Sequence, residues 1–332
     1  MQKRILLVGA GAAGQVFGLY LARGGADVSV FVRPKYESAA RGGYRLYHVD
    51  PLGRRKAERL LPSEVHTSIE SLANAEPFDQ VWLCVATTSL DPRWLADLAE
   101  VTAPATLVSF QPGLGVRERL EQAASRERIA QGVIGFLAWA TPLEDSTDQR
   151  ELAVTEDPGI AYFAPPGMVI PISSPSERRA LQVIDALRAG GMASHLVGDA
   201  EADLAFGTAI LMPLVGGLEL AGWSFATFRE GDAPKLVTEA AKEALTVTIA
   251  ETGREPPILS KALLFPQVLQ LGFWVMPKVA PIDVETYLRV HFTKVGEQTR
   301  MLLAGYSERA ARHGLPNDAI ESMTRGLEDL PA

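Results

Sequence analysis

Apolar runs alternate with amphipathic segments over the first 140 residues of the chain. The runs are almost continuous in apolar side chains, as in strands that are buried on both faces of a parallel sheet. They cover residues 3–8, 26–32, 78–86 and 105–110. The intervening segments repeat apolar residues at helical spacing. They cover residues 12–23, 92–101 and 116–124. This order predicts an α/β fold with a doubly wound sheet.

The pattern is less regular between residues 44 and 163. A glycine-flanked stretch at 44–61 predicts a hairpin inserted after the second strand. One long strand is predicted over 129–139, and short strands of a small sheet over 152–154 and 160–163. These segments add a second, smaller sheet to the predicted fold.

After Gly198 the apolar spacing becomes helical and stays so. The predicted helices cover residues 199–222, 234–252, 258–276 and 283–312. We therefore expect two domains, residues 1–198 with the sheets and residues 199–332 made of helices alone.

Glycines follow the first strand at the spacing G-x-G-x-x-G, at Gly9, Gly11 and Gly14. A strand before this turn and a helix after it are the context that a dinucleotide-binding motif requires. The helix N-terminus offers unpaired N–H groups to phosphates. We therefore predict a Rossmann domain over residues 1–198, with a pyrophosphate held by Gly9, Ala10, Gly11, Ala12, Ala13 and Gly14.

The end of the second strand distinguishes NADP from NAD. NAD sites usually have an Asp or Glu there, which binds the ribose 2′-hydroxyl. This chain has Arg33 and Lys35 there instead, and the first acidic residue after the strand is Glu37. Arg33 would suit a 2′-phosphate, so NADP is favoured over NAD. The alternative is that Arg33 is simply a solvated charge at a strand end.

Thr87 follows the apolar run at 78–86. Ligands of open α/β sheets bind outside the carboxyl ends of the strands. Thr87 is therefore a further candidate for cofactor binding.

The composition of the chain excludes some classes of binding partner. The chain has 332 residues, 47% hydrophobic and 22% charged, with a net charge of −8. That charge argues against nucleic acid or an anionic membrane as the main partner. The single cysteine, Cys84, allows no disulfide framework, so a cytoplasmic protein is expected. The five histidines are scattered, and no metal site is expected.

These features together resemble the ketopantoate reductase (2-dehydropantoate 2-reductase) family, with the elements in matching order along nearly the whole chain. The family pairs a Rossmann domain with an all-helical domain of the phosphogluconate-dehydrogenase-like type, and uses NADPH to reduce an α-keto acid. The resemblance rests on residues 9–14, 30–33, 113–115, 212–213 and 308–316.

The chain departs from the family where chemistry is expected. The family's proton donor is a lysine early in the long helix that follows the Rossmann domain. Residues 189–228 contain no Lys or Arg, and Leu204 aligns with that lysine. Pro112 replaces the asparagine of a His-Asn-Gly turn, and Thr87 replaces a lysine found after the preceding strand. The resemblance therefore implies a diverged, more apolar substrate site.

A late segment offers substitutes for the missing acid. Glu297 falls close to a glutamate of the family, and Lys294 lies three residues before it on the same predicted helix. Residues three apart share a helix face. Lys294 and Glu297 are the catalytic candidates, with His291 on the same face as another proton donor. The alternative is an exposed ion pair worth about 0.2–0.5 kcal/mol. His195 and Tyr287 are weaker candidates that are better explained by packing.

We therefore expect an NADP-dependent oxidoreductase that reduces a small, keto acid-like carbonyl compound. The alternative is a protein that binds NADP without catalysis, for example as a redox sensor. Aromatic residues of the helical domain either line the substrate pocket or form its core. They are Trp223, Phe225, Phe228, Phe265, Phe273 and Trp274. The apolar surface of the helical domain predicts a homodimer.

Overall fold

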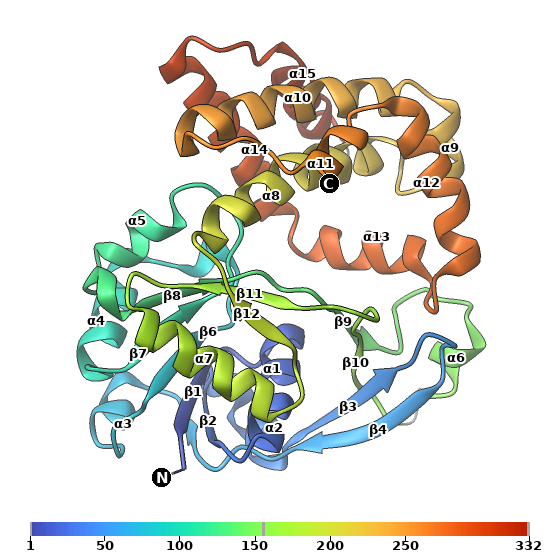
Figure 1. The fold of residues 1–332 in the computed structure, drawn as a ribbon. Helices are drawn as coiled ribbons and strands as arrows, with labels where there is room; N and C mark the ends of the chain where they lie inside the picture. The colour runs from blue at the N-terminus through green and yellow to red at the C-terminus, as the bar shows by residue number, and fades with distance from the viewer. Residues whose placement is uncertain (1, 155–156, 331–332) are drawn as a thin grey trace. The chain divides into compact units, whose positions relative to one another are not determined.

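The computed structural model describes residues 2–154 and 157–330. The chain forms two compact units (Figure 1). One consists of Met1–Pro142 with Gln149–Glu201, and the other of Leu143–Asp148 with Ala202–Ala332. The short segment Leu143–Asp148 thus belongs to the helical unit, although it lies in sequence between strands of the first unit.

The first unit is built on a large twisted sheet. Its strands lie in the order β12-β11-β8-β7-β6-β1-β2-β5. Neighbouring strands are parallel except for the antiparallel pair β11 and β8. The bounds are β1 Arg4–Val8, β2 Asp27–Phe31, β5 Val65–His66, β6 Gln80–Leu83, β7 Thr106–Ser109, β8 Ile129–Gly132, β11 Ile170–Ser173 and β12 Ser194–Leu196. From β5 to β8 this is the Rossmann strand order, with its switch point at β1 and β6.

Helices cover both faces of this sheet (Figure 1). Ile5 and Leu7 of β1 pack in one core with α1 (Ala12–Arg23) and α7 (Glu177–Ala189). Leu6 and Val8 point the other way, into a core with α3 (Ile69–Ala73), α4 (Pro92–Val101) and α5 (Val116–Glu121). The short helix α2 (Glu37–Gly42) follows β2. The predicted doubly wound α/β fold is confirmed.

A second sheet lies beside α1 and has the strand order β4-β3-β10-β9. The predicted hairpin is present as β3 (Tyr44–Val49) and β4 (Arg55–Leu60). β9 (Leu137–Thr141) and β10 (Gly159–Phe163) complete the sheet. α1 contacts both sheets, so the helix that follows the glycine turn is held on two sides.

Two predictions in this region were wrong. The apolar stretch at 129–139 is not one strand, because β8 and β9 belong to different sheets and are separated by residues 133–136. Residues 152–154 are not a strand either, since α6 (Gln149–Leu152) ends there in a turn. A run of three apolar residues is too short for periodicity to separate helix from strand.

The second unit is helical, which confirms the predicted fold class. Phe225, Phe228 and Phe273 form its aromatic core, with ring centroids 4.7 and 4.8 Å apart at the two contacts of Phe273. The helices are α8 Ala200–Leu220, α9 Phe225–Glu230, α10 Ala233–Thr252, α11 Ile258–Ala262, α12 Pro266–Val279, α13 Val284–Lys294, α14 Gly296–His313 and α15 Asp318–Glu328.

Two predicted helices are each divided in the structure. The segment 258–276 becomes α11 and α12, with Pro266 in the first turn of α12, where proline is tolerated. The segment 283–312 becomes α13 and α14, which meet at Val295 with φ −114° and ψ 22°. A β-branched residue followed by Gly296 is a weak helix sequence, because glycine costs about 1 kcal/mol relative to alanine.

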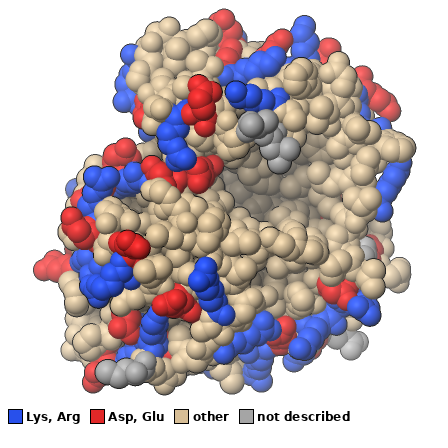
Figure 2. All heavy atoms as spheres, viewed as in Figure 1, with Lys and Arg blue, Asp and Glu red and all other residues tan. Residues whose placement is uncertain are grey.

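Among the described residues, α8 is the helix long and apolar enough to cross a membrane by length and composition alone. Within the protein, 61% of its most apolar window is buried. The core helix of a soluble protein has the same features, so α8 is weak evidence for a membrane span. Charges of both signs are interspersed over the described residues visible in Figure 2.

Candidate dinucleotide-binding site

The glycine turn joins three strands of the large sheet at their carboxyl ends. Gly9 has φ +90°, and its N–H donates to the carbonyl of Phe31 at 2.9 Å. A Cβ at Gly9 would lie 2.9 Å from both the carbonyl oxygen of Cys84 and Cγ1 of Val85. Glycine is therefore required here by conformation and by space, because β2 and β6 close on the turn from either side.

The other two glycines have different roles. A Cβ at Gly14 would lie 2.5 Å from the carbonyl oxygen of Gly9 and 3.0 Å from Cβ of Cys84, so Gly14 lets α1 pack against the turn. At Gly11, no atom of the described residues lies within 4 Å of an added Cβ. Gly11 is the N-cap of α1 and provides no side-chain cap. The turn thus presents open backbone and the positive end of a helix dipole, which favours an anion.

Arg33 belongs to a small exposed basic cluster after β2. Its guanidinium lies over the ring of Tyr36 at 5.2 Å and donates to the Tyr36 hydroxyl at 3.4 Å. Lys35 Nζ lies 4.9 Å from the same ring. A hydrogen bond from Lys35 and the charges of Lys35 and Arg33 lower the pKa of Tyr36. The first acid of the segment, Glu37, accepts from Arg41 at 2.8 Å. Two cations beside β2 are therefore available to an anionic ligand.

Thr87 is fixed by the protein itself. It is buried, and its hydroxyl donates to the carbonyl of Pro112 at 3.0 Å. Gln111, after β7, donates to the carbonyls of Leu83 at 2.7 Å and Val85 at 3.0 Å. These bonds lock the ends of β6 and β7 together. Sequence reasoning missed the role of Gln111, and its only signal was a polar residue directly after a buried strand.

The structure separates the two catalytic candidates. Lys294 is the last residue of α13, whereas Glu297 lies in the first turn of α14. Both side chains are exposed. The expectation that they share one helix face was wrong, because the helix breaks at Val295. Catalytic roles for the two residues stay a prediction.

The other candidates lie in two different settings. His291 stacks on Tyr287 at 5.4 Å, and burial, with a smaller effect of the charge of Lys294, lowers the pKa of His291. Burial raises the pKa of Tyr287 to about 12. His195 is exposed on the edge strand β12. Of these, Tyr287 is a packing residue by its burial.

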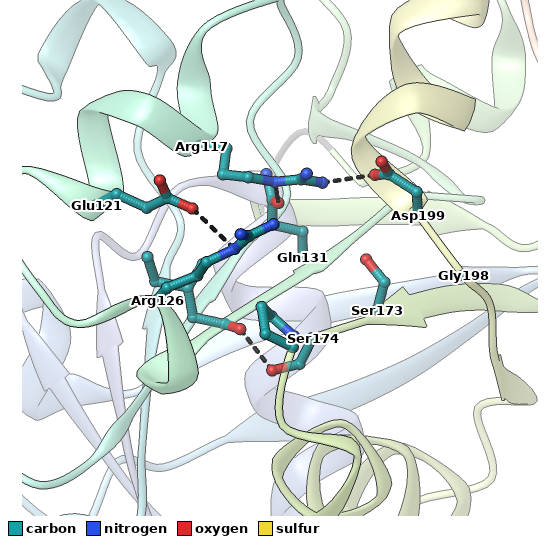
Figure 3. Close-up of a pocket in the computed structure, with 10 residues that line it drawn as sticks. Arg117, Glu121, Arg126, Gln131, Ser173, Ser174, Gly198 and Asp199 are labelled. Carbon is teal, nitrogen blue, oxygen red and sulfur yellow. Dashed lines mark hydrogen bonds and ion pairs between the residues drawn. The ribbon is translucent and has the colours of Figure 1, made fainter. Parts of the chain in front are cut away.

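The first unit has a polar pocket of about 190 Å³ next to α5 (Figure 3). Arg117 of α5 donates to Asp199 at 2.5 Å and to Gln131 at 3.0 Å, and pairs with Glu201 at 2.8 Å. Arg126 pairs with Glu121 at 3.3 Å. Burial raises the pKa of Glu201 despite its arginine partner. The arginines of this pocket are neutralised by carboxylates, so the network ties α5 to the start of α8.

Comparison with protein families finds a match in the part of the chain that contains this candidate site. The family model described as "Ketopantoate reductase PanE/ApbA" matches residues 5–141. This part of the chain is therefore similar to a ketopantoate reductase family domain. The domain contains the glycine turn, the cluster at Arg33, Thr87 and Gln111. It ends before α8, so the position of Leu204 lies outside the matched part.

Solved structures resemble the whole chain in fold. A PanE/ApbA family ketopantoate reductase from Ralstonia eutropha JMP134 has a TM-score of 0.71 at 16% identity, covering 98% of this chain and 97% of that one. D-mandelate dehydrogenase with NADH and anilino(oxo)acetate has a TM-score of 0.71 at 14% identity, with the same coverages. The 2-dehydropantoate 2-reductase from Porphyromonas gingivalis W83 has a TM-score of 0.69 at 14% identity, covering 99% and 100%.

No curated protein matches the chain in sequence. The family domain and these structures support an oxidoreductase, on a fold shared with enzymes named for keto and hydroxy acids. At such low identities the structures establish the fold, while the substrate and the choice of nucleotide depend on residues of this chain.

Proposed function

We propose that the protein is an NADP-dependent oxidoreductase that reduces a small 2-oxo acid. The observation that carries the proposal is the pairing of an open glycine turn with the basic cluster after β2. Gly11 leaves backbone accessible at the N-terminus of α1, and Arg33 and Lys35 lie beyond the end of the neighbouring strand. Both cofactors have a pyrophosphate for the glycine turn, but only NADPH has a 2′-phosphate that the basic cluster could bind. NADPH would therefore make more contacts than NADH.

The residues of the chain would divide the binding of this cofactor. Backbone N–H groups of residues 9–14 would hold the pyrophosphate, and Arg33 the 2′-phosphate. Tyr36 holds the guanidinium of Arg33 near the strand end through the contacts described above. When bound, the nicotinamide supplies hydride. D-mandelate dehydrogenase is described with NADH, so Arg33 is the feature that favours NADP here.

A proton donor for the carbonyl oxygen is also required. We propose Lys294 for this role, with Glu297 as a neighbouring charge, because both lie in the segment that resembles the family's late glutamate. The test is a screen of 2-oxo acids, 2-hydroxy acids and imines, followed by NADPH fluorescence. Lys294→Ala should lower kcat at least a hundredfold, since general acids contribute about 10²–10⁴-fold. Unchanged turnover would remove Lys294 from the mechanism.

Two observations favour a second function. The resemblance aligns Leu204 with the catalytic lysine of the family. Lys294 and Glu297 lie on different helices. In this second function the protein would bind NADPH as a redox sensor and would not catalyse hydride transfer. NADPH binding with no turnover across the whole screen would favour this second function.

We propose further that the protein is a cytoplasmic homodimer. An exposed apolar face on and beside α12 supports self-association. Its members are Leu263, Phe265, Val268, Leu271, Trp274 and Val279. Of the aromatic residues considered above, Phe265 and Trp274 thus lie outside the core. Light scattering tests the dimer, and a monomer at micromolar concentration would contradict it.

A further inference from the structure

Helix α5 sends an arginine back to the carboxyl edge of the large sheet. α5 follows the turn after β7, and Gly115 (φ +84°) begins it. Val116 and Leu120 face the core, and Arg119 is half-buried. The guanidinium of Arg119 donates to the backbone carbonyl of Thr87 at 3.3 Å. A side chain from the helix after β7 therefore contacts the segment that follows β6, the strand beside β1.

Arg119 differs from the other arginines near α5 in its charge balance. Arg117 pairs with Asp199 and Glu201, and Arg126 with Glu121. For Arg119, no carboxylate of residues 2–154 or 157–330 forms an ion pair within 4.0 Å. Its one hydrogen bond uses a neutral carbonyl, while a guanidinium has five N–H donors. The sheet edge thus holds a half-buried positive charge that no carboxylate of the described residues neutralises.

The strand order shows on which side of the glycine turn the charge of Arg119 lies. β1 lies between β2 and β6, so the cluster of Arg33 and the contact of Arg119 with Thr87 are on opposite sides of the glycine turn. In this strand order a dinucleotide crosses the switch point at β1 and β6. With the adenosine 2′-phosphate at Arg33, the nicotinamide end lies on the side of Arg119. A positive charge on the nicotinamide side would lie near the substrate and away from the adenosine half of the cofactor.

We propose that Arg119 binds the carboxylate of the substrate. This rests on the proposed function, and it restricts the substrates to small organic acids with a carboxylate next to the reacting carbonyl. A planar guanidinium binds a carboxylate through two parallel N–H···O bonds, which fixes orientation as well as affinity. Residues 189–228, where the resembled family has its lysine, contain no Lys or Arg. Arg119 would supply the positive charge that selects a carboxylic acid as substrate. Arg119 is a binding residue and moves no proton.

The test uses oxamate as the probe and oxamide as its neutral analogue. Both are titrated calorimetrically into the full-length protein, with and without NADPH. Wild type should bind oxamate at least tenfold more tightly than oxamide in one of these conditions. Arg119→Gln should abolish that preference, because a charged hydrogen bond contributes about tenfold or more. Arg119→Lys should recover part of it. Arg93→Gln, an exposed arginine on α4, is the matched control and should bind like wild type.

The outcomes separate this inference from the proposed function. Equal binding of oxamate and oxamide by wild type in both conditions would overturn it, as would Arg119→Gln binding oxamate normally. Tenfold weaker NADPH binding by Arg119→Gln with unchanged oxamate binding would overturn it too, by assigning the residue to the cofactor. If wild type does not bind NADPH at all, the cofactor proposal fails, while the titrations without NADPH still decide the role of Arg119.

Discussion

Alanine substitutions in the glycine turn should separate folding from nucleotide binding. At Gly14, an alanine methyl would lie 2.5 Å from the carbonyl oxygen of Gly9, which is backbone and cannot rotate away. Overpacking of this kind costs about 1–3 kcal/mol. In a unit of this size, about 2–4 °C of Tm is lost per kcal/mol. Gly14→Ala should therefore lower Tm by about 2–12 °C.

Gly11→Ala should behave in the opposite way. Its φ of −71° suits alanine, and no atom of the described residues lies within 4 Å of the new methyl group. Loss of a glycine N-cap costs under about 1 kcal/mol, so Tm should change by less than about 4 °C. The methyl group would occupy the place where backbone meets the pyrophosphate. NADPH binding should weaken at least tenfold, about 1.4 kcal/mol.

Differential scanning fluorimetry and NADPH fluorescence titration on the same preparations measure both quantities. Wild-type affinity in Gly11→Ala would refute the reasoning, because it would show that the pyrophosphate does not approach the turn at Gly11. A Tm loss in Gly11→Ala equal to that in Gly14→Ala would also contradict the prediction, because of these two glycines Gly14 alone has a steric conflict with an added Cβ.

Three further predictions concern the surroundings of the site. Gln111→Leu leaves two buried carbonyls without their donor, and urea titration should show a loss of about 2–4 kcal/mol in the free energy of unfolding; a loss under 1 kcal/mol would contradict the locking role. Glu151 is buried, pairs with Arg55 and accepts from Thr141 at 2.6 Å. Glu151→Ala should cost about 3–5 kcal/mol, whereas the exposed, paired Glu37→Ala should cost under about 1 kcal/mol, and equal costs would contradict the difference in burial. Burial raises the pKa of the half-buried Cys84 thiol to about 12, so native protein at pH 8 should react with a thiol reagent much more slowly than unfolded protein. Fast labelling of native protein would contradict the predicted low reactivity of the thiol. Because the folded pKa of Cys84 is raised, the stability contributed by its neutral thiol is complete below the unfolded pKa of about 8.5 and is lost as pH rises towards 12.

The local elements near the cofactor site were predictable because each carries its own signal. α1 begins and ends at Ala12 and Arg23, where the glycine spacing and apolar periodicity put it. β1 is a short apolar run that ends before Gly9, and β6 lies within a mostly apolar run that ends before Thr87. Such features depend on residues close together in the chain, so no knowledge of tertiary contacts was needed.

Pairing between distant segments was not predictable in the same way. Residues 129–139 are apolar except for Gln131, and only their strand partners show that β8 joins the large sheet while β9 pairs with β10. The break at Val295 likewise followed from a weak local preference that the helical spacing of its neighbours concealed. Arg119 gave no signal at all, because its contact with Thr87 spans 32 positions, with α4 and β7 between them.

Calorimetry of NADPH and NADH binding to wild type and to Arg33→Ala decides whether the cluster after β2 selects NADP. We expect Arg33→Ala to weaken NADPH binding about tenfold or more, through the loss of a charge-assisted bond, and to change NADH binding by less than about twofold. Arg41→Ala, an exposed arginine paired with Glu37, should bind both cofactors like wild type. Equal losses for both cofactors in Arg33→Ala, or failure of wild type to bind NADPH, would contradict the account.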